Sequence, residues 1–238
     1  MLDSVAVSFR FVTRRLRVRS LTVAVFFGSL AAISSAQMPP APAQQGTRVR
    51  DASALKTPPG ANVAIVEFED MQCPQCGRLN PLLRGAAAQY NIPLLRHDFP
   101  LAMHNWSLYA AINARWFDAK GKKIGDEYRD QVFANQASIF NPESLHQFTE
   151  KFAKGHGLTL PFAVDPQGTL AAQVKADQAL GERTGIDHTP TIWIVISHGN
   201  GPPYREVVDS TRLYEAIDQA LADTRSAAPA KKSIARKK

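Results

Sequence analysis

Cysteine is scarce in this chain of 238 residues, which contains only Cys73 and Cys76. A structural zinc site needs four ligands. No second cysteine pair exists, and no two of the six histidines lie three to five residues apart. We therefore expect no metal site. A purely structural disulfide is also disfavoured, because a bridge across so short a loop constrains the unfolded chain little.

Long apolar runs are missing as well. The apolar stretch 21–33 is shorter than the roughly 20 residues that a membrane-spanning helix needs, and five arginines precede it. A basic segment, an apolar segment and the small residues at 34–36 are typical of a secretory signal peptide. Residues 1–36 are therefore predicted to be removed near Ala36-Gln37 on export to the periplasm, by the Sec or the Tat route, which the sequence does not distinguish.

An excess of positive charge is absent from most of the chain. Residues 37–224 hold 17 Lys and Arg against 20 Asp and Glu, a net charge of −3. The overall basicity belongs to the ends, so we expect no nucleic-acid partner. Residues 37–60 are rich in Pro, Ala and Gln and are predicted to be a flexible lead-in, too short for a dimerisation domain. A monomer is expected, with a basic disordered tail at 224–238.

The two cysteines stand as Cys-x-x-Cys between a predicted strand at 63–68 and a helical pattern that starts after Cys73. Unpaired N–H groups at a helix N-terminus favour a thiolate, so the pKa of Cys73 should be lowered. Pro74 suits the first helical turn, where its missing N–H costs nothing. We predict that Cys73 is the nucleophile and Cys76 the resolving cysteine of a redox-active disulfide, with no other cofactor.

The rest of the sequence alternates between strand and helix signals. Residues 92–99 are predicted to form a second strand, 104–184 a block of helices without a strand, and 191–196 with 204–208 an antiparallel hairpin. Ser210 is predicted to be the N-cap of a final helix.

This order resembles the DsbA-like exported thiol:disulfide oxidoreductases of the thioredoxin superfamily. The resemblance covers roughly residues 60–223, and its most specific parts are 66–76 and 185–191. It implies an α/β, thioredoxin-like fold with a mixed sheet flanked by helices, built from residues 61–102 and 185–223. It also implies that residues 103–184 form an inserted all-helical subdomain.

The resemblance assigns roles to further residues. Pro190 matches the cis-proline of the family, and the main chain of Thr189 before it is expected to bind the client protein. Apart from the resemblance, His188 and Met71 are also expected in the client groove, with Met71 as a groove or packing residue. Glu67 matches a buried acid that exchanges a proton with the resolving cysteine. Its apolar sequence neighbours favour that role over one as a surface acid.

The direction of electron flow depends on two neighbours of the motif, Gln75 and Thr189. The strongest oxidases of this kind resemble Cys-Pro-His-Cys. The Gln75 side chain can donate a hydrogen bond to the Cys73 sulfur but brings no positive charge, so Pro74-Gln75 should give a less stabilised thiolate and a less oxidising disulfide. Thr189 also occurs before the cis-proline in the isomerase branch. We expect an oxidase that passes its disulfide to folding secreted proteins, reoxidised by a membrane partner of the DsbB or vitamin-K-epoxide-reductase-like (VKOR-like) type.

Two alternatives remain open. One is a disulfide isomerase or reductase of the same fold. The other is a non-enzymatic copper(I) carrier in which Cys73, Cys76 and either Met71 or His188 bind the metal.

Overall fold

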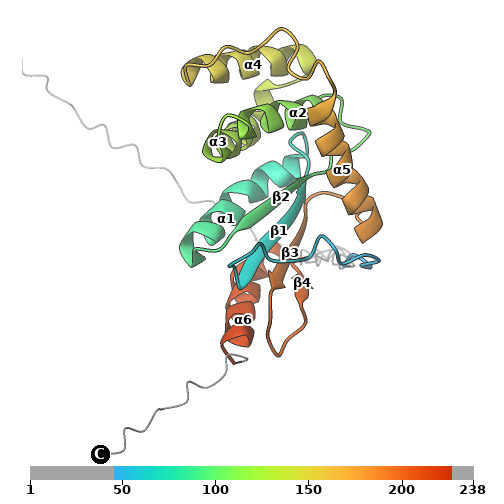
Figure 1. The fold of residues 1–238 in the computed structure, drawn as a ribbon, viewed down its shortest axis with the longest axis vertical. Coiled ribbons are helices and arrows are strands. Elements are labelled where there is room, and N and C mark those ends of the chain that lie inside the picture. The colour runs from blue at the N-terminus through green and yellow to red at the C-terminus, as the bar shows by residue number, and fades with distance from the viewer. Residues whose placement is uncertain (1–45, 227–238) are drawn as a thin grey trace, which may run out of the picture. The chain divides into compact units, whose positions relative to one another are not determined.

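A computed structural model describes residues 46–226. The predicted signal peptide, the first part of the lead-in and residues 227–238 of the tail lie outside this range. The elements (Figure 1) are, in chain order, β1 (Val63–Glu69), α1 (Pro74–Tyr90), β2 (Leu94–Asp98), α2 (Ser107–Asp118), α3 (Lys122–Ala134), the 3-10 turn η1 (Gln136–Ser138), α4 (Pro142–Gly155), α5 (Thr169–Thr184), β3 (Thr191–Ile196), β4 (Tyr204–Glu206), the 3-10 turn η2 (Ser210–Arg212) and α6 (Leu213–Ser226).

Four strands form one mixed sheet in the order β2-β1-β3-β4. β1 and β2 are parallel, as the helix between them requires, whereas β3 runs antiparallel to both β1 and β4. Every residue of the two central strands is buried, so both faces of the sheet are covered. The predicted thioredoxin-like fold class is confirmed.

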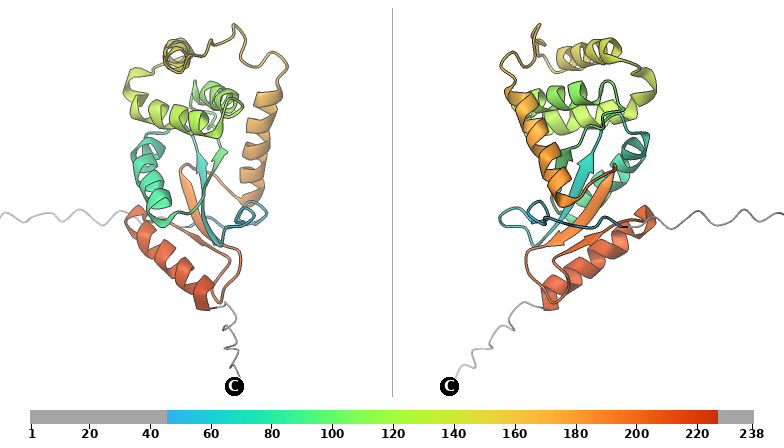
Figure 2. Two further views of the ribbon diagram at one scale, coloured as in Figure 1. Left: turned by 60° about the vertical axis from the view of Figure 1, so that its left-hand side comes forward. Right: turned by 90° about the vertical axis from the view of Figure 1, so that its right-hand side faces the viewer.

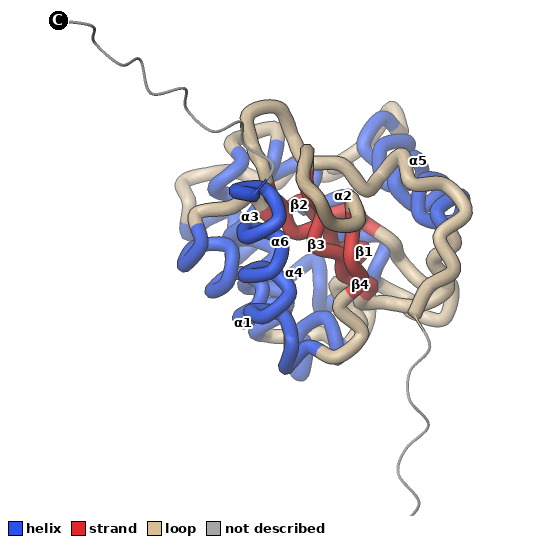
Figure 3. Tube along the Cα trace, turned by 90° about the horizontal axis from the view of Figure 1, so that it is seen from below, coloured by secondary structure: helices blue, strands red, loops and turns tan. Residues whose placement is uncertain are grey.

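Alternate residues of the strands feed two separate cores, because successive side chains of a strand point to opposite faces. Figure 3 shows α1 and α6 on one side of the sheet and α5 on the other. The core beneath α1 and α6 includes Ile65, Leu83, Ile192, Ile194 and Leu213. The core on the α5 side includes Leu55, Val66, Phe68, Phe99 and Trp193.

Helix α5 approaches the sheet at Gly181. A Cβ atom at this position would lie 2.7 Å from the ring of Phe99 and 3.0 Å from that of Phe68, closer than real Cβ contacts. The absence of a side chain therefore allows α5 to lie directly on these rings.

Helices α2, α3 and α4 form a block of their own (Figure 2), with a core of aromatic side chains. The ring of Phe117 lies 4.6 Å from that of Tyr128 and 5.0 Å from that of Phe152, and the Tyr128 hydroxyl is 2.8 Å from Thr149 Oγ1. Between β2 and β3 the chain is helical without a strand, as predicted. Within residues 46–226, no helix combines the length and hydropathy needed to cross a bilayer.

Three predicted boundaries are wrong. Residues 46–60 are not a flexible lead-in: Ala54 and Leu55 are buried in the sheet core, and the Arg50 N–H donates to the Thr184 carbonyl at 2.9 Å. Helix α6 continues to Ser226, so residues 224–226 do not belong to a disordered tail. The last helical segment is capped by the Asp209 carboxylate, which accepts from Thr211 N–H, because Ser210 already lies inside η2.

Candidate active site

Cys73 occupies the N-cap position of α1, where the chain leaves β1 and turns into the helix. Pro74 is the first helical residue. A main-chain N–H at this position would have no partner within the helix, and proline has no N–H to leave unpaired. The Cys73 carbonyl accepts the Gly77 N–H at 3.2 Å. Cys73 is 7% exposed and Cys76 is fully buried, one helical turn further along. Both are free thiols.

The environments of the two sulfur atoms drive their pKa values apart. The pKa of Cys73 is lowered to about 5, first by a hydrogen bond from the Cys76 thiol and then by the Cys76 N–H, the Thr189 side chain and the Gln75 N–H, although burial acts the other way. Burial, the hydrogen bond to Cys73 and the charge of Glu67 together raise the pKa of Cys76 well above its ordinary value. At neutral pH the reduced pair is therefore a thiolate beside a thiol.

The loop before β3 lies beside Cys73, although its residue Thr189 is 116 positions further along the chain. The Cys73 sulfur lies 3.3 Å from the Thr189 carbonyl oxygen, and the Thr189–Pro190 peptide bond is cis. Sequence reasoning placed these residues at the site through the family resemblance, and the fold brings them there.

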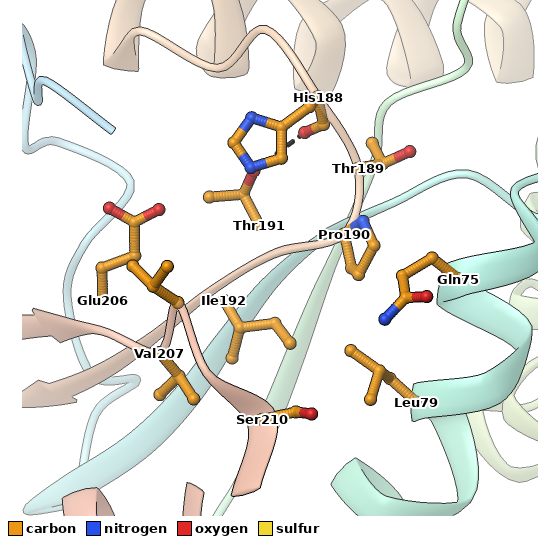
Figure 4. Close-up of a pocket in the computed structure, with 11 residues that line it drawn as sticks. Gln75, Leu79, His188, Thr189, Pro190, Thr191, Ile192, Glu206, Val207 and Ser210 are labelled. Atoms are coloured by element: carbon orange, nitrogen blue, oxygen red, sulfur yellow. Dashed lines mark hydrogen bonds between the residues drawn. The ribbon is translucent and has the colours of Figure 1, made fainter. Parts of the chain in front are cut away.

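A groove runs from this loop between α1 and the chain after β4 (Figure 4). Gln75 and Leu79 from α1 line one side, Glu206 and Val207 line the other, and Pro190 with Ile192 lies between them. Polar main-chain groups beside apolar side chains suit an extended peptide. His188 also lines the groove, more than half exposed and 2.6 Å from Asp187 Oδ1.

Two predicted contributions to the site are corrected. Met71 is 2% exposed and packs in the core of the helical block, so its side chain cannot contact a client. The Gln75 side-chain oxygen accepts from Arg78 Nε at 3.2 Å, so this amide is turned toward Arg78, and the Gln75 bond to the Cys73 sulfur comes from the main chain. Pro74 is exposed beside the thiols.

Glu67 lies buried in the middle of β1. Its carboxyl group is 0% exposed, and burial followed by the charge of Glu69 raises its pKa to about 8. Within the described part of the chain, neither carboxyl oxygen has a hydrogen-bond partner. Glu67 is therefore mostly protonated at neutral pH and can donate a proton.

Sequence reasoning missed the buried charges around Glu67. Glu69 is also buried, with Arg96 Nε 3.4 Å from one of its oxygens and Arg129 Nε 3.4 Å from the other, whereas Glu67 is 3.9 Å from Arg96 Nε. Asp130, 3.4 Å from Arg96, lies at the edge of the cluster. Burial raises the pKa of Glu69 as well, although the charges of Arg96 and then Arg129 act the other way. The signal was available: residues two apart on a strand share a face.

A second set of missed residues holds the loop Asp70–Cys73, which we call the redox loop. The Asp70 carboxylate accepts from Leu101 N–H at 2.7 Å, from His104 Nδ1 at 2.7 Å and from the Ser107 hydroxyl. Gln72 accepts from the Trp106 N–H at 2.8 Å. Three of these partners lie in the segment between β2 and α2, and the fourth, Ser107, is the first residue of α2, so the chain that leads into the helical block fixes the loop that carries Cys73.

Metal ligands do not gather at this site. Among residues 46–226, no three His, Cys, Asp or Glu side chains are grouped as a metal site requires.

Comparisons with known proteins agree with this geometry. A family model described as thioredoxin matches residues 58–219. The structure is similar to Wolbachia pipientis alpha-DsbA1, with a TM-score of 0.59 and 15% identity over 73% of this chain and 92% of that chain. It is also similar to Pseudomonas aeruginosa DsbA2, with a TM-score of 0.52 and 23% identity over 71% of this chain and 94% of that chain.

A curated relative is much longer. The Na(+)/H(+) antiporter NhaA 1 of Salinispora arenicola (strain CNS-205) is 25% identical over 178 residues, which are 74% of this chain and 26% of the antiporter. This chain spans about a quarter of that protein's length. The similarity therefore concerns one part of the antiporter.

The family match extends from before β1 to within α6 and includes both cysteines and Pro190. The two DsbA structures align with about seven tenths of this chain, and their chains align almost completely. The chain therefore belongs to the thioredoxin family, and its fold is similar to that of the two DsbA structures.

Proposed function

We propose that this protein is an exported, monomeric thiol:disulfide oxidoreductase that acts as an oxidase on folding secreted proteins in the periplasm. The contrast between a stabilised Cys73 thiolate and a buried Cys76 thiol carries the proposal. Stabilising the thiolate stabilises the reduced form, which makes the corresponding disulfide a stronger oxidant. The Cys73–Cys76 disulfide is then the only redox group that the reaction needs.

The first step is attack by a client thiolate on the Cys73 sulfur of this disulfide. A client–Cys73 bond forms while the bond between Cys73 and Cys76 breaks, and Cys76 leaves as a thiolate. Glu67 is protonated at neutral pH and close enough for its charge to act on Cys76, so it donates the proton that neutralises this leaving group.

The second step releases the oxidised client. Another client thiolate attacks the client's own sulfur in the mixed disulfide, and Cys73 leaves as a thiolate. Its lowered pKa makes Cys73 a good leaving group. Two electrons have then passed from the client to Cys73 and Cys76, and a membrane reoxidase of the DsbB or VKOR-like type would pass them on to the quinone pool.

The groove beside Cys73 would hold the client during both steps. Thr189 offers main-chain groups to an extended segment, Pro190 shapes the wall against the sulfur, and His188 lines the outer part. Met71 takes no part, because it is buried.

The site assignment can be tested with a reduced, unfolded protein as client. Oxidised wild type should form the client disulfide, and Cys73→Ser should be inactive. Cys76→Ser has no disulfide to donate; mixed instead with a client that already holds a disulfide, its Cys73 thiolate should attack that bond, release one client thiolate and accumulate as a mixed disulfide. Equal client oxidation by wild type and Cys73→Ser would contradict the assignment.

The direction of the reaction needs a separate measurement. An oxidase should be isolated from the periplasm with its disulfide formed and should favour the reduced form in a glutathione equilibrium. Isolation in the reduced form, with reactivation of a scrambled client, would support an isomerase instead. A mature N-terminus at Gln37 in the periplasmic fraction would test export.

A further inference from the structure

A side chain of the helical block contacts the main chain of Cys73 directly. Gln136 lies in η1, after α3, and its Nε2 donates to the carbonyl of Met71 at 2.7 Å and to that of Cys73 at 3.0 Å. One amide group therefore binds two carbonyls of the redox loop, the second of which belongs to the nucleophile itself.

The other half of this amide packs against the first turn of α1. A Cβ atom at Gly77 would overlap Gln136 Oε1. Gly77 follows Cys76, and its N–H donates to the Cys73 carbonyl. The lack of a side chain at Gly77 thus lets Gln136 reach the carbonyl that also accepts the first hydrogen bond of α1.

These contacts bear on where the Cys73 sulfur points. Cys73 has extended backbone angles, with φ −70° and ψ 119°, while the next residue is already helical. Rotation of the peptide unit that carries its carbonyl would change the position of the sulfur relative to the N–H groups of Gln75 and Cys76. Such N–H groups stabilise a thiolate only when they point at it.

We propose that Gln136 is a positioning residue that holds the redox loop so that the Cys73 sulfur faces the first N–H groups of α1. This inference rests on the proposed role of Cys73 as the nucleophile. Through Gln136, the inserted helices tune the reactivity of a cysteine that belongs to the thioredoxin-like part of the chain.

The expected consequence is a change in thiolate stability. Gln136→Ala removes both donors, and Gln136→Glu places an acceptor oxygen opposite two carbonyl oxygens at almost the same volume. Each should raise the pH at which Cys73 becomes a thiolate, by about one unit for alanine and more for glutamate, which means about tenfold less thiolate below that pH. The glutathione equilibrium should shift toward the disulfide by a similar factor.

The measurement is the rate of Cys73 alkylation by iodoacetamide in the reduced protein as a function of pH. Gln131→Ala and Gln131→Glu are matched controls, because Gln131 is exposed on α3. They introduce the same side chains, and for glutamate the same change of charge, away from the redox loop. These controls should leave the pH midpoint of alkylation unchanged.

The inference is overturned if the midpoint of folded Gln136→Ala equals that of wild type, even when its melting temperature is lower. Gln136 would then support the fold alone. Gln136→Met, which keeps the length without the donors, serves as a second variant if the glutamate does not fold. Alkylation needs no client, so a shifted midpoint in a protein that oxidises no client would leave the positioning role standing and refute the proposed function.

Discussion

At the scale of single residues, two chemically identical thiols acquire different properties because they lie one turn apart at the start of α1. Cys73 lies outside the first turn, where main-chain N–H groups and the Cys76 thiol point at its sulfur. Cys76 lies inside the helix, where burial raises its pKa more than a main-chain hydrogen bond at Asp70 lowers it. Nucleophile and resolving cysteine are thus distinguished by position in the helix.

We expect Cys73 to be alkylated with a pH midpoint of about 5, and Cys76 to stay unreactive through neutral pH. Because the Cys76 thiol is the largest contribution to the low pKa of Cys73, Cys76→Ala should raise this midpoint. Mass spectrometry after timed iodoacetamide treatment measures both values. A midpoint near 9 in wild type would contradict the assignment of the nucleophile.

The protonation of Glu67, the acid beneath the thiols, is also determined by its surroundings. Three arginines, Arg96, Arg115 and Arg129, pair with four carboxyl groups, those of Glu67, Glu69, Asp98 and Asp130, so the carboxyl groups outnumber the cations. One proton retained on Glu67 brings the cluster closer to neutrality, as low-dielectric surroundings favour.

Replacing Glu67 by glutamine removes the acidic proton while keeping the size and shape of the side chain. Glu67→Gln should slow client oxidation by about tenfold or more, because the amide cannot donate a proton to Cys76. It should also remove the fall in rate of wild type as the pH rises through about 8. Stability should not decrease at pH 7, since wild-type Glu67 is mostly uncharged there. The same pH profile in both proteins would exclude Glu67 as the donor, and the surface variant Glu127→Gln serves as a control.

At the scale of elements, the position of α5 on the sheet depends on one missing side chain. The rings of Phe68 and Phe99 meet edge to face, with their centroids 6.2 Å apart, and Gly181 of α5 lies on both. The helix ends at Thr184, six residues before Pro190, so its position also places the loop that faces Cys73.

Gly181→Ala should therefore lower the free energy of unfolding by about 1–3 kcal/mol, since the added methyl group overlaps two packed rings. Gly155→Ala is the matched control, because a Cβ atom there meets no atom within 4 Å. It should be neutral or stabilising by up to about 1 kcal/mol through helix propensity. Urea denaturation measures both. Equal effects of the two substitutions would show that α5 does not depend on this close approach.

At the scale of the whole described chain, buried ion pairs join the helical block to the sheet. Arg129 from α3 lies 3.4 Å from Glu69 on β1 and 3.8 Å from Asp98 on β2, and Arg115 from α2 also pairs with Asp98. Breaking one partner of such a pair leaves a buried charge uncompensated. The block therefore has a defined orientation on the sheet, which holds the redox loop from one side.

Redox state should change the stability of the whole fold in a pH-dependent manner. The folded-state pKa of Cys73 lies below its unfolded value of about 9, so its thiolate stabilises the reduced protein fully above that value and loses this effect as the pH falls through about 5. The excess in melting temperature of the reduced over the oxidised form should shrink between pH 7 and pH 4. Cys73→Ala has neither the thiolate nor the disulfide, so its melting temperature with and without reductant should be the same at every pH. An excess that stays constant with pH would refute the linkage.

Sequence reasoning performed well where the signal is local. The apolar run before Cys73, the proline after it and the helical spacing that follows predicted β1, α1 and the asymmetry of the thiols. Each depends on neighbours within a few residues. It failed at Gln75, whose side chain binds Arg78, and at Met71, because a side chain's direction depends on packing.

By itself, then, the sequence determined the redox motif, the order of strands and helices, and the identity of Glu67 as an acid in an apolar strand. Only the tertiary structure decided which distant groups surround the motif. The Glu69–Arg129 pair and the Gln136 bonds join residues 60 or more positions apart. A single glutamine or arginine on a helix carries no pattern, and its role exists only once packing brings it to the loop that holds Cys73.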